Sequence, residues 1–236
     1  MRPEDLETLR RLRSEIESTL RRVYSASPRF YYGGSYGKNT LIRESFDLDI
    51  VMYFAATDPR SMKSLYYLVL KTLQDANYVV RAKNVALRLP YDGGFHIDVV
   101  PGKAQDATFY YATLYKSEED STRQTSIKKH IDTVRQSDVR ELIRLMKLWR
   151  YRNGFDWSSF ALEQTTIRAL AGNRSADLSV QMTKVREFIK DNILTVKLID
   201  PANTNNEIQM SVGLRLQLKN AATQSLCFQN WGQVIA

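Results

Sequence analysis

The chain has 236 residues, of which 43% are hydrophobic and 25% charged, and this composition excludes an intrinsically disordered protein. No apolar run approaches the roughly 20 residues of a membrane helix, and the N-terminus is charged from Arg2 onward, so we expect a cytoplasmic protein with no membrane association. The formal net charge of +8 favours polyanionic partners such as nucleotides or nucleic acid.

The first predicted element is an amphipathic helix over residues 3–24, because apolar side chains recur there at spacings of three and four. A glycine-rich turn follows, and the alternating run 46–53 then indicates a strand. Asp58 and Pro59 predict the start of the next helix, with Asp58 as its cap and an apolar face over 62–73.

Three short β-type runs come next, at residues 78–81, 85–89 and 95–100, and the turn sequence between the last two is a hairpin signal. After Gly102 the strand signal fades and helical periodicity dominates. The sequence therefore predicts an α+β protein with two parts. Residues 1–110 form the first part, whose N-terminal helix is a spine, and residues 111–236 form a helical part.

The single cysteine, Cys227, cannot build a disulfide framework, which favours a reducing compartment. Its apolar neighbours Leu226 and Phe228 predict that it is packed. We also expect Trp149 and Trp157 to lie in the core.

Carboxylates are concentrated on the predicted strands. Asp47 and Asp49 are two residues apart, so they project from one face of their strand, and Asp98 shares a face with His96 on a second strand. An isolated Asp-x-Asp is usually a solvated strand face. Three converging carboxylates, however, repel unless a cation neutralises them, and oxygen ligands are those that Mg²⁺ prefers. The pattern predicts a site for two divalent ions, with His96 as a structural neighbour.

The glycine-rich turn Gly33–Gly37 precedes this pair and supplies backbone that can approach a phosphate closely. Eleven residues separate Ser35 from Asp47. Glycine, serine, this gap and Asp-Leu-Asp-Ile together form the pattern of polymerase-β-like nucleotidyltransferases.

Longer stretches carry the resemblance further. GGSYGKNTLIRESFDLDIVMYF at 33–54 and HIDVVPG at 96–102 resemble the catalytic segments of the oligoadenylate synthases and the cGAS/DncV-like nucleotidyltransferases. RLMKLWRYRNGFDWSSFALE at 144–163, IDPANTNNEI at 199–208 and NWGQVI at 230–235 resemble segments of their helical half. The matches run along nearly the whole chain in the expected order.

This resemblance implies a catalytic lobe with a small mixed sheet, packed against a C-terminal helical lobe, and it assigns roles to single residues. Asp47 and Asp49 would hold both Mg²⁺ ions, for which Mn²⁺ could substitute, and Asp98 would bind the catalytic one. Gly34 and Ser35 would bind the terminal phosphates.

In the helical lobe, Lys147 and Ser159 would reach the triphosphate, and Phe160 would stack on a base or pack. Asn39 stands where relatives often have glycine, which leaves the backbone angles of the turn open.

The implied activity is template-free joining of nucleoside triphosphates with release of pyrophosphate. The favoured product is a cyclic di- or oligonucleotide second messenger of the antiviral signalling type. The alternatives are nucleotide addition to an RNA 3′ end or linear oligoadenylate synthesis, and a catalytically dead nucleic-acid sensor. A nucleic-acid activator or RNA acceptor is a further expected partner.

Overall fold

The computed structural model describes residues 3–25, 28–45, 47–91, 95–172, 177–228 and 230–235. The chain separates into two compact units. The first comprises Met1–Asn39 and Phe46–Asp132, and the second comprises Thr40–Ser45 and Thr133–Ala236. The short segment Thr40–Ser45 therefore belongs to the second unit, although its neighbours on both sides belong to the first.

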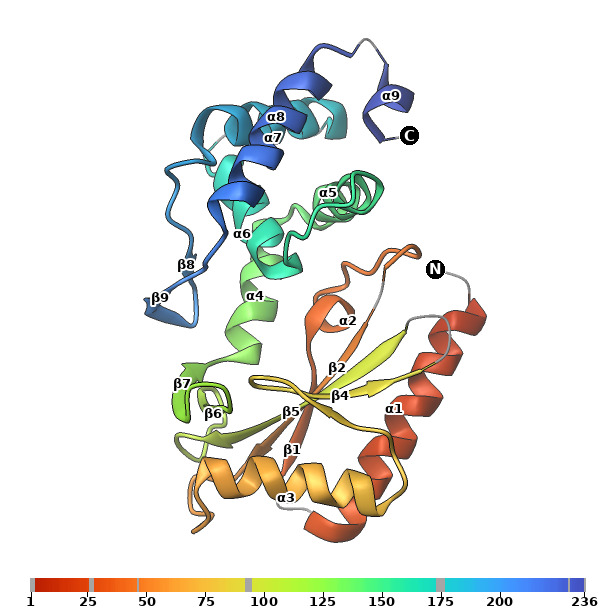
Figure 1. The fold of residues 1–236 in the computed structure, drawn as a ribbon, viewed down its shortest axis with the longest axis vertical. Helices are drawn as coiled ribbons and strands as arrows, with labels where there is room; N and C mark the ends of the chain where they lie inside the picture. The colour runs from red at the N-terminus through yellow and green to blue at the C-terminus, as the bar shows by residue number, and fades with distance from the viewer. Residues whose placement is uncertain are drawn as a thin grey trace. The chain divides into compact units, whose positions relative to one another are not determined.

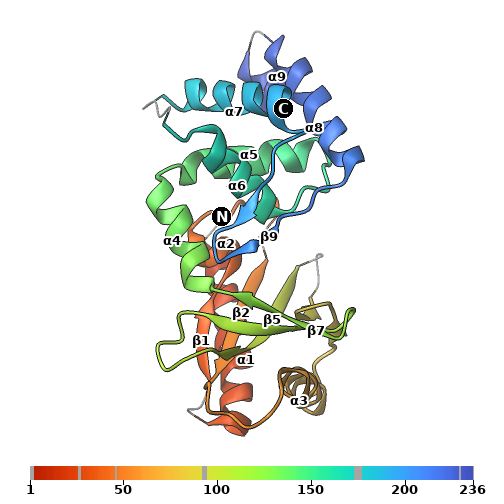
Figure 2. The same cartoon turned by 90° about the vertical axis from the view of Figure 1, so that its left-hand side faces the viewer.

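The first unit is built on a seven-stranded mixed sheet with the order β1-β2-β5-β4-β3, to which β6 and β7 are added beyond β5. Only β2 and β5 pair in parallel among the described strands, and Figure 2 shows these two strands side by side. The strands are β1 Arg29–Tyr32, β2 Leu48–Phe54, β3 Arg81–Ala82, β4 Leu87–Pro90, β5 His96–Ala104, β6 Ala112–Lys116 and β7 Ser121–Thr125.

Two helices cover one face of this sheet, α1 (Pro3–Tyr24) and α3 (Met62–Asp75) (Figure 1). Alternate residues of the strands point into the core that these helices close, because successive side chains of a strand face opposite sides. The core side chains of β2, β4 and β5 are Leu48, Ile50, Met52, Leu87, Leu89, Ile97 and Val99. The residues between them on each strand consequently face the other side of the sheet.

The first unit extends beyond the predicted boundary at residue 110, to Asp132. The sequence shows little strand signal after Gly102. In the structure, however, β5 continues to Ala104, and β6 and β7 follow it. The strand β7 has the sequence Ser-Thr-Arg-Gln-Thr, which has no apolar periodicity. It forms because its backbone pairs with β6, which is a tertiary effect.

Two further local predictions are wrong. The N-cap of α3 is Ser61, whose hydroxyl accepts a hydrogen bond from the Ser64 amide, whereas the Asp58 carboxylate binds Arg60. Cys227 is exposed, because it caps the C-terminal end of α8, whose buried face consists of Leu218, Ala222 and Ser225.

The second unit is helical, and its helices are α5 (Arg140–Arg152), α6 (Ser159–Ala169), α7 (Leu178–Asn192), α8 (Val212–Leu226) and α9 (Trp231–Ile235). The helix α4 (Ile127–Ser137) contains the boundary between the units. Trp149 and Trp157 lie in the core of this unit, as predicted from the sequence. No helix in the described part of the chain has both the length and the apolar character of a membrane span.

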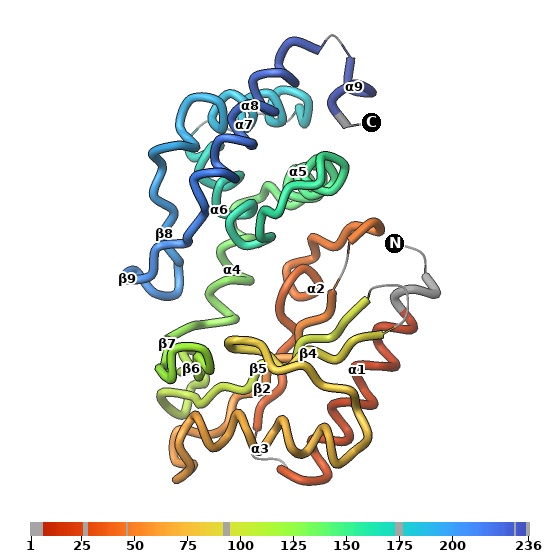
Figure 3. The backbone as a smooth tube through the Cα atoms, in the orientation of Figure 1, coloured from red at the N-terminus to blue at the C-terminus, as the bar shows by residue number. Residues whose placement is uncertain are grey.

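A two-stranded hairpin of β8 (Ile199–Asp200) and β9 (Asn203–Glu207) joins α7 to α8 (Figure 3). Asp200 shapes its turn, because Oδ1 accepts a hydrogen bond from the Ala202 amide at 2.8 Å and Oδ2 accepts one from Asn206 at 3.1 Å. Asp200 is therefore a turn residue of this hairpin.

Candidate active site

Three charged residues form a row on the face of the sheet opposite to α1 and α3. The parallel pairing of β2 and β5 places Asp49 directly opposite Asp98, and the antiparallel pairing of β4 and β5 places Arg88 opposite Asp98. Directly paired residues project to the same side of a sheet, so the row Arg88–Asp98–Asp49 shares one face. The structure thus brings together two of the three carboxylates that the sequence singled out.

Asp98 is held by a guanidinium. Arg88 Nε donates to Asp98 Oδ1 at 2.9 Å and Arg88 Nη2 donates to Oδ2 at 2.8 Å, which is a bidentate pair. We did not single out Arg88 from the sequence. The hairpin register alone, with Pro90 opposite His96, would have placed it opposite Asp98.

His96 lies between two of the aspartates. Its Nδ1 is 2.9 Å from Asp47 Oδ1, and its Nε2 is 3.7 Å from Asp98 Oδ2. The expected position of His96 beside Asp98 is therefore observed, and its contact with Asp47 is an addition to that expectation.

Asp49 is buried beside other acidic groups of this face. Burial, followed by repulsion from Asp98 and more weakly from Asp47, raises the pKa of Asp49 from 3.8 to about 6. Lys38 and Arg88 act in the opposite direction but do not cancel the effect. A face whose acidic groups are incompletely neutralised is one that attracts a cation.

The donor atoms at this face fit a hard divalent ion in type, because carboxylate oxygens are the protein ligands that Mg²⁺ and Mn²⁺ prefer. Their arrangement does not amount to a finished site. Among the described residues, no group of three or more Asp, Glu, His or Cys side chains is positioned to hold a metal ion. At Asp98, both carboxylate oxygens accept hydrogen bonds from Arg88.

The glycine-rich turn lies against Asp49. The Gly33 amide donates to the Asp49 carbonyl at 2.9 Å, and the five-residue helix α2 (Gly34–Lys38) begins at the next residue. Gly34 has φ +52°, and a Cβ at this position would lie 1.6 Å from Asp49 Oδ2. Only glycine allows this approach. Ser35 follows in the same turn with its side chain partly exposed.

The backbone angles at Asn39, which the sequence left open, are left-handed, with φ 57° and ψ 43°. Asn39 caps α2, and asparagine tolerates this conformation better than most residues, which explains why it can stand where glycine is common.

In the second unit, Lys147 lies in a buried ion pair. Its side chain is 1% exposed, and Nζ lies 3.1 Å from Glu163 Oε1 and 2.9 Å from Thr40 Oγ1. These contacts attach Thr40, and with it the segment Thr40–Ser45, to the helices. To bind a triphosphate, as the family resemblance implies, Lys147 would have to give up or share these partners.

The other two candidate residues of the second unit begin α6. Ser159 Oγ accepts a hydrogen bond from Arg150 Nη1 at 3.0 Å, and Arg150 also donates to the Trp157 carbonyl at 2.9 Å. Phe160 is partly buried and packs against the apolar core of this unit. Packing, one of the two roles expected for Phe160, is therefore present.

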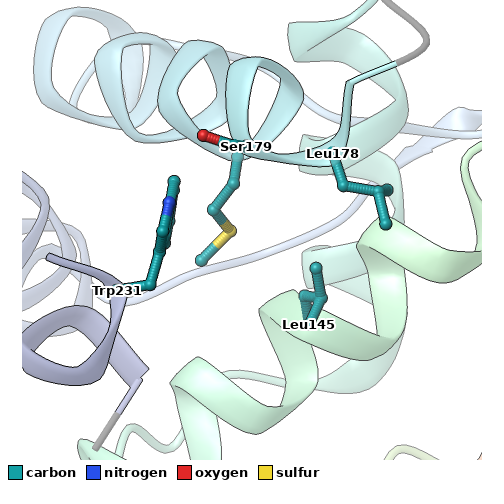
Figure 4. Close-up of a pocket in the computed structure, with 5 residues that line it drawn as sticks. Leu145, Leu178, Ser179 and Trp231 are labelled. Carbon is teal, nitrogen blue, oxygen red and sulfur yellow. The ribbon is translucent and has the colours of Figure 1, made fainter.

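An apolar hollow of about 210 Å³ also occurs in the second unit, between α5, α7 and α9 (Figure 4). None of the candidate residues lines it. Its lining has no charged group, which a site for phosphate groups requires. The lining residues are Leu145, Leu178, Ser179, Met182 and Trp231.

Comparison with solved structures shows which fold this arrangement belongs to. Escherichia coli CdnC, solved with ATP, is 20% identical and matches 97% of this chain and 87% of its own, with a TM-score of 0.72. The chain has the fold of the cGAS/DncV-like nucleotidyltransferases. The Elizabethkingia meningoseptica CdnE cyclic dinucleotide synthase, solved with GTP and Apcpp, is 16% identical over 93% of this chain and 92% of its own, with a TM-score of 0.74.

A comparison of sequences also finds a cyclic oligonucleotide synthase. A cyclic AMP-AMP-AMP synthase of Escherichia coli is 24% identical over an alignment that covers 86% of this chain and 75% of the relative. No family model matches the chain. The α+β fold class and the resemblance inferred from the motifs are both confirmed.

We expect Gly34→Ala to destabilise the protein more than Gly154→Ala. Both glycines have positive φ, so both substitutions carry a conformational cost of about 1–2 kcal/mol. Only at Gly34 does the new methyl group collide with Asp49, which adds about 1–3 kcal/mol, whereas nothing lies within 4 Å at Gly154. Thermal unfolding measures the difference, and equal shifts for the two variants would contradict the close approach.

The raised pKa of Asp49 makes stability depend on pH. The folded protein favours the protonated carboxyl, so the stabilisation from this group is present at low pH and is lost as the pH rises towards about 6. We expect Asp49→Asn to raise the unfolding temperature at about pH 7.5, where the charge is costly, and to change it little at about pH 3.5, where the carboxyl is protonated in both the folded and the unfolded chain. Asp156→Asn, which removes a carboxylate from an exposed loop, is the control.

The Lys147–Glu163 pair predicts a double-mutant result. Lys147→Met should cost about 3–5 kcal/mol, because it leaves Glu163 charged and buried without its cation. The double change Lys147→Met with Glu163→Met should recover most of this loss. The control is Lys63→Met, which breaks the exposed Lys63–Asp120 pair and should have little effect. If Lys147→Met is as harmless as the control in urea denaturation, the buried pair is not structural.

Proposed function

We propose that this protein is a metal-dependent, template-free nucleotidyltransferase that joins nucleoside triphosphates into a cyclic di- or oligonucleotide second messenger. One observation carries the proposal most directly: Asp49 and Asp98 lie in register on parallel strands, beside a turn that only glycine can form. The fold shared with cyclic oligonucleotide synthases supports the same activity.

In this proposal, Asp47, Asp49 and Asp98 hold divalent ions, Mg²⁺ or Mn²⁺. When bound, such ions lower the pKa of an attacking ribose hydroxyl and stabilise the departing pyrophosphate oxygen. Gly34 and Ser35 bind the terminal phosphates, because a turn without a Cβ lets backbone amides approach an anion and the hydroxyl of Ser35 can donate.

The helical unit supplies the remaining substrate contacts in this proposal. Lys147 and Ser159 bind the triphosphate, and Phe160 contacts a base. Since Lys147 is paired with Glu163, the proposal requires Glu163 to share or release it.

A second function, nucleotide addition to an RNA 3′ end or linear oligoadenylate synthesis, is favoured by the net charge of +8, which suits a polyanionic acceptor or activator. A catalytically dead sensor is disfavoured because all three carboxylates are present.

Product analysis tests these alternatives. Purified protein is incubated with each nucleoside triphosphate and with every pair, with Mg²⁺ or Mn²⁺, and with or without double-stranded RNA or an RNA primer. We expect a phosphatase-resistant cyclic product in mass spectra, which Asp49→Asn abolishes and the control Asp156→Asn does not. Extension of the primer would favour the second function, and nucleic-acid binding without any product would favour the sensor. Stimulation by double-stranded RNA that weakens with salt would identify an activator.

A further inference from the structure

Arg88 lies on the strand next to Asp98 and binds its carboxylate. It lies on β4, with Leu87 and Leu89 on either side buried in the core. These two anchors hold the strand in place, so Arg88 can leave Asp98 only by a movement of its side chain. Its side chain is 34% exposed, whereas that of Asp98 is 13% exposed, so the guanidinium has access to solvent and the carboxylate has little.

The pair is a strong one in its geometry. Two parallel hydrogen bonds, at 2.9 and 2.8 Å, engage both oxygens of Asp98. Charge-assisted bidentate pairs of this kind are stronger than single hydrogen bonds between neutral groups. Any other ligand of these oxygens must share them with a positive charge or displace it.

The charge of Arg88 reaches beyond Asp98. Because Asp98 lies between Arg88 and Asp49 in the row, Arg88 also acts on Asp49, and its own charge is stabilised by Asp47 and Asp49. Arg88 is thus a built-in cation at the face where the proposed function places divalent ions. A positive charge that is bound to Asp98 opposes the approach of a second cation to the same carboxylate.

We propose that Arg88 is a positioning residue that competes with divalent ions for Asp98, so that tight metal binding requires the negative charge of a bound triphosphate. This inference rests on the proposed metal-dependent function. A triphosphate brings several negative charges to the face and offsets the charge of Arg88, which makes the binding of metal and of nucleotide mutually dependent. Without nucleotide, the bidentate pair between Arg88 and Asp98 keeps the affinity of the protein for metal low.

The test is a measurement of Mn²⁺ affinity without nucleotide, by isothermal titration calorimetry. We expect Arg88→Met to lower the Kd by roughly tenfold or more, because removal of an adjacent positive charge is worth at least one tenfold step in affinity. Arg81→Met is the matched control. Arg81 lies opposite Arg88 in the backbone pairing of β3 with β4. Arg81→Met removes the same charge from the protein, and we expect it to change the Kd for Mn²⁺ by less than about twofold.

A double-mutant comparison checks that Arg88 acts through Asp98. In an Asp98→Asn background, Arg88→Met should change the Kd for Mn²⁺ by less than about threefold, because the shared carboxylate is gone. Arg88→Lys keeps the charge but loses the bidentate pair, so its Kd should lie between those of the wild type and Arg88→Met. Circular dichroism of each variant establishes that it is folded, and Arg88→Gln replaces Arg88→Met if that variant is not.

The outcomes separate the two proposals. An Arg88→Met variant that binds Mn²⁺ no better than the wild type, or binds it more weakly, overturns the competition and makes Arg88 a support that orients Asp98 for the metal. If neither protein binds Mn²⁺ and the wild type makes no product, the proposed function fails as well. If both bind Mn²⁺ equally and the wild type makes product, only the inference about Arg88 fails.

Discussion

The parallel pairing of β2 with β5 is the constraint on which the rest of the candidate site depends. It places two acidic side chains directly opposite each other on one face, although their mutual repulsion opposes this arrangement. The apolar residues that alternate with them bury the other face against α1 and α3, so the strands cannot rotate or slip by one residue to separate the charges. Core packing therefore maintains an electrostatically unfavourable arrangement at the surface of the sheet.

The protein manages this unfavourable charge in two different ways. At Asp98, a guanidinium from the next strand neutralises the carboxylate through two hydrogen bonds. At Asp49, the attraction of Lys38 and Arg88 does not offset burial and the repulsion from Asp98, and the pKa of Asp49 is raised to about 6. The two aspartates are thus neighbours with unequal surroundings. Such differences between paired carboxylates are typical of sites where the groups have separate tasks.

The second unit also contains buried charges, but there the two charges are opposite and attract each other. Lys147 and Glu163 form an ion pair, and Lys147 also binds Thr40, which lies in the chain between the glycine-rich turn and β2. A substitution in these helices can therefore act on the chain segment that follows the glycine-rich turn without any direct contact with a substrate. This link would make the effects of Lys147 variants on activity ambiguous unless stability is measured beside them.

Local patterns in the sequence determined the elements with strong periodicity and the identity of the acidic residues. The helix at 3–24 follows from apolar spacings of three and four, the strands of Asp49 and Asp98 follow from side-chain alternation, and the hairpin before Asp98 follows from its turn sequence. Tertiary structure decided which groups of different elements come into contact. The strand β7 exists because β6 offers its backbone, Lys147 is buried because Glu163 lies on another helix, and Asp98 is neutralised because a hairpin register brings Arg88 opposite to it. Sequence periodicity reports which face of an element is buried, but it contains no information on which charged group another element will place against it.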